Sequence, residues 1–190
     1  SSKDMEVDGH WGFINGSTFI GEGLSLGTLF IYDYAGVNPE TGESQWWYLD
    51  PDSNEWIKTS DYENYMNGNL KSRKLSKCTQ PVVFGGFGTS LYAYGFDLSI
   101  AFDYQLGGTT IDGSYASYMS SPHSNSLGEN YHLDLLNAWT PENKNSDIPR
   151  FQFGDQYNAA TSTRFLTSTN YLNISNINFG YTFPAKWFKG

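Results

Sequence analysis

Apolar and polar residues alternate most regularly between Phe96 and Leu106. Every second position in this segment is apolar or aromatic, which is the pattern of a β-strand with one apolar face. The preceding segment, 82–94, is rich in residues that favour strands, and Gly95 stands between the two. The two segments are therefore predicted to form a long hairpin closed by a tight turn.

A second alternating segment runs from Ser175 to Phe183. Its apolar positions are Ile177, Phe179, Tyr181 and Phe183. Upstream of it, Leu172 and Ile174 fall on the opposite parity, so we expect a β-bulge near Ser175. The pattern predicts another strand with one apolar face, interrupted once near its start.

The rest of the chain carries weaker patterns. Shared parity predicts a strand within 24–34, and a short apolar run predicts another over 45–49. Only 129–139 has helical spacing. The segment 107–162 is a long, mostly polar connection, whereas the predicted hairpin turns on about one glycine. Long loops combined with short turns are typical of outer-membrane barrels, so we expect an all-β, antiparallel transmembrane β-barrel segment with long extracellular loops and one short loop helix.

Composition and charge narrow the function classes. The chain has 11 Lys and Arg against 20 Asp and Glu, a net charge of -9, which excludes non-specific nucleic-acid binding through a basic surface. Aromatic residues make up 17% of the chain and charged residues only 16%, a balance that favours strands. No apolar run is long enough for a spanning helix, but this does not exclude spanning strands.

Catalytic and metal-binding motifs are absent from the sequence. The 3 histidines stand in unrelated contexts, and no pair of carboxylates is singled out by its surroundings. The acidic segment 50–54 resembles the start of a calcium loop but lacks the glycine and the distal glutamate of an EF-hand. We therefore expect no enzyme activity, no cofactor and no metal.

Clustered tryptophans offer a candidate binding surface. Trp46, Trp47 and Trp56 could form a flat platform that stacks on sugar rings, or they could pack inside the protein wall. The first possibility supports an alternative function, a secreted β-sandwich glycan-binding module that uses these three residues.

Four motif blocks follow one another along most of the chain. They are Tyr34–Glu43 (YAGVNPETGE); Phe84–Leu91 with Gly95–Ser99 and Tyr104–Gly108; Trp139–Asn143 with Asp147–Arg150; and Ser162–Leu166 with Tyr171–Pro184. In their order and in their residues, these blocks resemble the C-terminal part of the barrel in the SusC/RagA family of TonB-dependent outer-membrane transporters. Asn38 stands where that family usually has aspartate.

The resemblance implies a fold and a function. Such transporters close a barrel of about 22 strands around a plug, so residues 1–190 would be a C-terminal portion of the barrel without the plug and the final strands. The protein would import oligosaccharides, peptides or other large nutrients across the Gram-negative outer membrane. Its partners would be a SusD-like surface lipoprotein and, through parts outside this chain, the TonB complex.

The resemblance also implies roles for individual residues. The residues expected to face outer-membrane lipid are Phe96, Leu98, Ile100, Phe102, Tyr104, Ile177, Phe179, Tyr181 and Phe183. Those expected to face the lumen are Asp97, Asp103, Asn176 and Asn178. The candidates for contact with a ligand or partner at the cell surface are Trp46, Trp47, Trp56 and Trp139.

Overall fold

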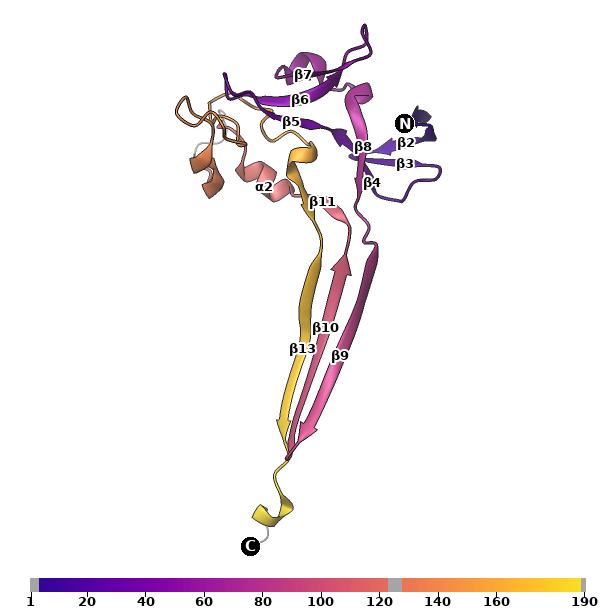
Figure 1. Ribbon diagram of the computed structural model, residues 1–190, viewed down its shortest axis with the longest axis vertical. Coiled ribbons are helices and arrows are strands. Elements are labelled where there is room, and N and C mark those ends of the chain that lie inside the picture. The colour runs from indigo at the N-terminus through magenta and orange to yellow at the C-terminus, as the bar shows by residue number, and fades with distance from the viewer. Residues whose placement is uncertain (1–3, 123–127, 189–190) are drawn as a thin grey trace. The chain divides into compact units, whose positions relative to one another are not determined.

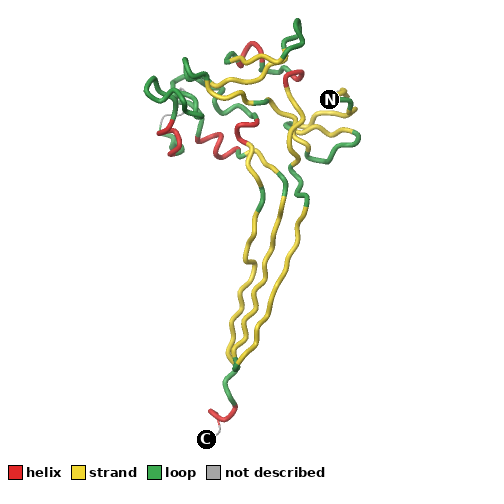
Figure 2. Tube along the Cα trace, viewed as in Figure 1, coloured by secondary structure: helices red, strands yellow, loops and turns green. Residues whose placement is uncertain are grey.

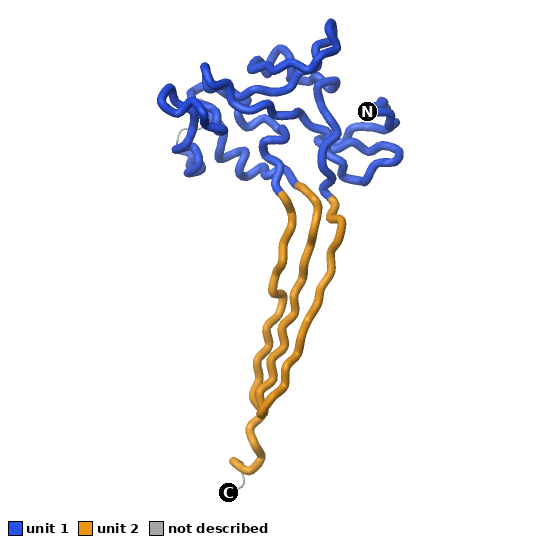
Figure 3. The backbone as a smooth tube through the Cα atoms, viewed as in Figure 1, with its two compact units in different colours: residues 1–79, 110–167 blue, residues 80–109, 168–190 orange. Residues whose placement is uncertain are grey.

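The computed structural model describes residues 4–122 and 128–188. The chain divides into two units, which are coloured separately in Figure 3: the first comprises residues 1–79 and 110–167, and the second residues 80–109 and 168–190. The described strands pair antiparallel in open sheets, which confirms the all-β, antiparallel prediction. No helix among the described residues has both the length and the apolar character needed to cross a membrane.

The first unit contains two antiparallel sheets (Figure 1). The larger has five strands in the order β1-β2-β3-β4-β8, with bounds Asp4–Val7, His10–Asn15, Thr18–Gly21, Thr28–Tyr32 and Arg73–Cys78. The smaller has three strands in the order β5-β6-β7, with bounds Tyr34–Val37, Ser44–Leu49 and Trp56–Thr59. Strand β6 confirms the prediction for 45–49. The strand predicted within 24–34 is shorter than its pattern, since β4 begins at Thr28 and ends at Tyr32, and Tyr34 belongs to β5 in the other sheet.

Burial explains why these strands differ in their sequence patterns. All five residues of β4 are buried, so both of its faces are apolar and its alternation is blurred. In β6 burial alternates, and Ser44, Trp46 and Tyr48 are the buried positions. This alternation places Trp46 and Trp47 on opposite faces of the strand. One core of the unit is therefore formed where β4 and one face of β6 meet their neighbours. A second core packs Phe165 against Ala116 and Met119.

Short helices occupy the connections, as the red segments in Figure 2 show. The α-helices are α1 (Tyr62–Tyr65) and α2 (Gly113–Tyr118), and the 3-10 helices are η1 (Leu70–Ser72), η2 (Leu133–Asn137), η3 (Thr163–Phe165) and η4 (Ala185–Phe188). The prediction of one loop helix over 129–139 was wrong in type and extent, since only η2 forms there. The local signals for α1 and α2 are their N-caps, Asp61 and Asp112, whose side chains accept backbone hydrogen bonds.

The second unit contains one antiparallel sheet of three long strands in the order β13-β10-β9. The bounds are Val83–Ala93 for β9, Phe96–Leu106 for β10 and Tyr171–Tyr181 for β13. A separate two-stranded sheet, most of whose residues belong to the first unit, pairs β11 (Thr109–Ile111) with β12 (Leu166–Ser168). The long hairpin predicted from the alternating pattern is confirmed.

Two irregularities define the long sheet. The hairpin turn has two residues, Tyr94 and Gly95, with φ angles of 54° and 86°, so the prediction that Gly95 alone closes it was wrong. Positive φ at both central residues is the geometry that matches the twist of a hairpin. The register between β10 and β13 shifts by one residue at Ser175, because Ala101 pairs with Asn176 and Phe102 with Ile174. The predicted bulge is confirmed.

Candidate functional site

The long sheet has one apolar face. Residues directly opposite one another in neighbouring strands project to the same face. Ile100 pairs with Ile177 in β13, and Phe102 pairs with Phe87 in β9. Beyond the bulge, Ile174 pairs with Phe102 and therefore joins the same face. The bulge thus keeps β13 in phase with β10 on both sides of Ser175.

This apolar face is uncovered. Ile177, Phe179 and Leu91 are each between 61% and 66% exposed. Soluble monomers seldom leave so large a contiguous apolar surface in water. A strand of 11 residues is about 36 Å long, and at a tilt of about 45° it spans about 25 Å, the height of the apolar band of outer-membrane barrels.

The opposite face of the sheet carries the polar residues of β10 and β13, together with Phe84 and Tyr92 of β9. Asp97 pairs with Gly180, and Asp103 pairs with Asn173 and Gly86. A side chain at position 180 would meet Asp97, because an added Cβ would lie 2.5 Å from its carboxylate oxygen. Glycine at this position therefore leaves room for a charged group on the polar face.

Aromatic rings gather where the long hairpin turns. Phe96 and Tyr181 lie 4.5 Å apart between ring centroids, and Phe183 lies 5.0 Å from Tyr181 and 6.0 Å from Trp187. Tyr94, in the turn itself, is 97% exposed. Amphipathic rings at one end of an apolar band are typical of the boundary between lipid and water.

A buried aromatic cluster lies at the centre of the first unit. The Trp46 ring is 3% exposed and packs edge-on against Tyr62 at 4.9 Å. Tyr62 in turn stacks on Tyr157 at 4.6 Å and meets Tyr32 at 5.7 Å. Burial, with the neighbouring Tyr32 hydroxyl, raises the pKa of Tyr62 to about 12. The cluster therefore joins residues distant in sequence into one core.

The other candidate tryptophans lie outside that core. Trp47 is partly buried with the ammonium of Lys58 5.2 Å from its ring, and Trp56 is exposed with Lys74 at 4.0 Å. Trp139 donates a hydrogen bond from Nε1 to the carbonyl oxygen of Pro39. Trp46 lies on the opposite face of β6 from Trp47, so the three clustered tryptophans do not share one flat platform. Ligand contact by Trp47, Trp56 and Trp139 stays a prediction.

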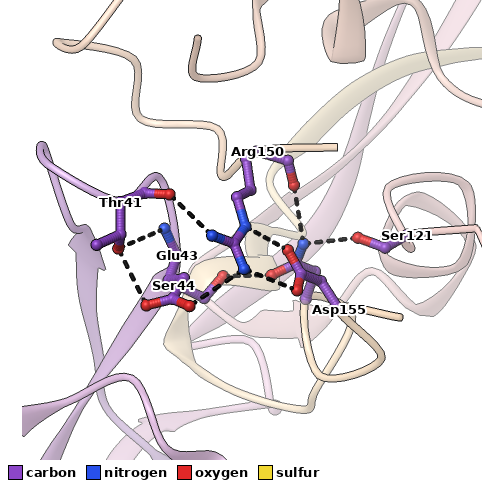
Figure 4. A network of polar contacts seen from close by, with 7 residues as sticks. Thr41, Glu43, Ser44, Ser121, Arg150 and Asp155 are labelled. Carbon is purple, nitrogen blue, oxygen red and sulfur yellow. Dashed lines mark hydrogen bonds and ion pairs between the residues drawn. The ribbon is translucent and has the colours of Figure 1, made fainter. Parts of the chain in front are cut away.

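Arg150 is the centre of a polar network in the first unit (Figure 4). Its guanidinium binds both carboxylate oxygens of Asp155, at 2.8 and 3.1 Å, and one oxygen of Glu43 at 3.1 Å. It also donates to the carbonyl oxygen of Thr41. The hydrogen bond to Asp155 is the main cause of the raised pKa of Arg150. Two-oxygen contact fixes both distance and orientation, so Arg150 fixes its own loop, 150–155, against the segment 41–43.

Asn158 extends this network into the interior. It is buried, accepts a hydrogen bond from Ser44 at 2.8 Å, and donates to Ser121 at 2.7 Å and to the carbonyl oxygen of Arg150. A buried amide needs such partners, because a buried donor or acceptor without a hydrogen bond lowers the stability of the fold. Asn158 thus joins β6 to the long connection that follows β10.

Three of the four motif blocks meet in these contacts. Gly42, in the first block, has a φ of +74° and packs against the Trp139 ring and Arg150 of the third block. Thr163, in the fourth block, donates to the Asp33 carboxylate and accepts from the backbone of Tyr34. The motifs were recognised in the sequence, but their mutual packing was not. The turn glycine and the paired charges are the signals that a sequence offers for it.

No metal centre is formed by the described part of the chain, because no group of three or more His, Cys, Asp or Glu side chains has the required geometry there. In the polar network around Arg150, the charged and polar groups satisfy one another through ion pairs and hydrogen bonds. Its arrangement serves to position loops, and it contains no nucleophile activated by a neighbouring base.

Comparisons with known proteins show which proteins resemble this chain in sequence and in fold. No family model matches the chain. It is 27% identical over 179 residues to TonB-dependent receptor P3 of Formosa agariphila, a match that covers 87% of this chain and 16% of the receptor. Its fold is similar to that of the RagAB peptide importer. The open-open state matches with a TM-score of 0.71 and 23% identity over 98% of this chain, and the closed-closed state with 0.66 and 24% over 95%.

The chain spans only a small part of these proteins, 18% of the solved chain in the open-open state and 20% in the closed-closed state. Sequence similarity to a TonB-dependent receptor and fold similarity to RagAB agree with the four motif blocks. They confirm the resemblance of this chain to part of a SusC/RagA-like TonB-dependent outer-membrane transporter.

Proposed function

We propose that residues 1–190 form a C-terminal portion of the β-barrel of a TonB-dependent importer in the Gram-negative outer membrane. The observation that carries this proposal is the three-stranded sheet β13-β10-β9, with one exposed apolar face and one polar face. In a barrel wall the apolar face meets lipid and the polar face meets the lumen. The barrel's other strands pair with the outer edges of β9 and β13, because lipid cannot satisfy open edges.

The lipid-facing set is the one named from the sequence: Phe96, Leu98, Ile100, Phe102, Tyr104, Ile177, Phe179, Tyr181 and Phe183. Support comes from the shared register of these residues, from the length of the strands and from the rings at the turn. The turn at Tyr94 and Gly95 lies at the periplasmic side, where such barrels have short connections. The loops of the first unit lie at the cell surface.

The transported nutrient is an oligosaccharide, a peptide or another large molecule. A SusD-like lipoprotein assists at the surface, and the TonB complex supplies energy through parts of the protein outside this chain. The similarity to a TonB-dependent receptor and to a peptide importer supports this function. The alternative of a secreted glycan-binding module has less support, because Trp46 is buried away from Trp47.

Cysteine labelling of the full-length protein in outer membranes tests the proposal. In a Cys78→Ser background, Asn178→Cys should react with a water-soluble maleimide through the lumen. Ile177→Cys, one residue away on the other face, should react only after denaturation. Equal reactivity of the two cysteine variants before denaturation would contradict a lipid-facing sheet.

The same membrane preparation supplies the second readout. Unboiled protein should migrate faster than boiled protein in electrophoresis, as closed barrels do. The contrary result is a soluble protein of about 21 kDa, the mass of residues 1–190, in the secreted fraction and without a heat-dependent shift. It would contradict the proposal and favour the alternative of a secreted glycan-binding module.

A further inference from the structure

The first unit contains a hollow of about 400 Å³ that the polar network around Arg150 does not use. Strands β1, β7 and β8 contribute to its lining, together with η1. Each of these three strands is the last strand at an edge of its sheet. The volume lies in the range of small-molecule sites, about 300–1,000 Å³. The hollow is therefore large enough for a ligand of one or two sugar residues.

The wall formed by η1 and β8 is cationic. Lys71, Arg73 and Lys74 line the hollow, and Lys77 follows them in the chain. These are four of the 11 cationic residues in a chain of net charge -9. A concentration of positive charge within seven positions of an acidic protein indicates a local preference for anions.

Of the three cations that line the hollow, two have no counterion within the described residues. Lys71 and Arg73 form no ion pair with any carboxylate in 4–122 or 128–188. The Arg73 guanidinium lies 5.0 Å over the Tyr32 ring and donates to the carbonyl oxygen of Gly16, while its buried Nε has no hydrogen-bond partner. Arg73 is thus already held by Tyr32 and Gly16, so Lys71 is the lining cation whose ammonium has no ion-pair partner among the described residues.

An aromatic ring and two carboxylates complete the lining. Trp56 is 37% exposed, and Lys74 lies 4.0 Å from its ring. A flat apolar surface is thus placed beside a positive charge. Glu6 and Asp8 lie in the wall formed by β1 and the turn after it, and their carboxylates accept no hydrogen bond from the other described residues. They are acceptors that a ligand with hydroxyl groups can satisfy.

We propose that this hollow binds an acidic saccharide, a sugar chain that carries carboxylate or sulfate groups. Lys71 binds the anionic group, the sugar ring lies against Trp56 beside Lys74, and its hydroxyls donate to Glu6 and Asp8. An acidic peptide fits less well, since its added carboxylates would lie near those two side chains. The inference rests on the proposed function, in which the loops of an importer meet the nutrient at the cell surface.

Titration calorimetry on the purified full-length transporter in detergent tests the site. The probes are a galacturonic acid hexasaccharide, its fully methyl-esterified form and hexaglutamate. We expect Lys71→Gln to weaken binding of the acidic hexasaccharide about tenfold and Lys71→Arg to restore it. Trp56→Ala should weaken it about fivefold. Lys77→Gln removes the same charge from β8 outside the hollow, so it should change the affinity less than twofold.

Each contrary outcome has a definite meaning. Equal affinity for the methyl ester would overturn the role of the cations. Tighter binding of hexaglutamate would make the ligand an acidic peptide, and no binding of any probe would overturn the site. The heat-dependent shift of the same preparation is measured in parallel. A protein that shifts but does not bind contradicts only this inference, whereas one that does not shift contradicts the proposed function itself.

Discussion

The two units of the chain use β-strands in opposite ways. In the second unit, β13 leaves apolar residues such as Ile177 and Phe179 exposed along one face. In the first unit, β4 buries all of its residues, and the Trp46 ring is enclosed by other aromatic rings. The same secondary structure thus faces two environments.

The difference teaches what stabilises each unit. The long sheet has no core of its own, so its side chains gain little until lipid or neighbouring strands cover them. The first unit is held by the contacts expected of a protein in water, an aromatic core and a buried polar network. Substitutions should therefore have different consequences in the two units.

The largest expected effect is that of a charge on the apolar face. Ile177→Lys places an ammonium where lipid is expected, which costs about 2–4 kcal/mol near the middle of a bilayer. The heat-shifted form of the full-length protein in outer membranes should decrease strongly. Asn178→Lys, on the polar face, is the matched control and should leave it near the native level. Equal loss in both variants would remove the distinction between the faces.

A smaller effect is expected from the polar network. Arg150→Met leaves Glu43 and Asp155 without their shared cation, and we expect a loss of about 1–3 kcal/mol because the pair is mostly but not fully buried. Limited proteolysis should show faster cleavage within 139–158, with the heat shift retained. The control is Lys144→Met, which breaks only the exposed pair with Glu40 and should cost less than about 0.5 kcal/mol.

The smallest effect concerns alkaline pH. The pKa of Tyr62 is raised to about 12 in the folded state from 10.0, so folded protein retains a proton that the unfolded chain loses. The stabilisation is complete below pH 10 and is lost as the pH rises toward 12. Its size is about 1 kcal/mol or less, because the ring is only partly buried and solvent screens the charge.

Absorbance at 295 nm, which follows tyrosine ionisation, checks this expectation. The difference between the titration curves of the native protein and Tyr62→Phe should have a midpoint near pH 12. A midpoint near pH 10 would mean that water reaches the aromatic cluster freely.

The sequence was most informative where the structure is least dependent on tertiary contacts. The alternation in β10 and the parity change near Ser175 predicted both strands and the bulge, because one face of each strand stays apolar throughout. The turn was missed in part, since Tyr94 adopts a positive φ that is uncommon outside glycine, asparagine and aspartate.

The first unit was less predictable for a physical reason. Its strands β1 to β3 are short, and β4 is buried on both faces, so their patterns are weak. The contact of Arg150 with Glu43 joins residues 107 positions apart, and no local pattern encodes such a pair. The opposite orientations of Trp46 and Trp47 could have been predicted from strand alternation alone.

The bulge at Ser175 has a consequence for how this strand tolerates changes in length. One extra residue has been accommodated by giving up regular pairing at a single place, while Leu172 and Ile174 stay on the side of their apolar neighbours. Parity, rather than length, is what the sheet holds constant. An insertion of one residue in β13 would require a second bulge to keep the later side chains on their original faces. An insertion of two residues would leave every later side chain on its original face.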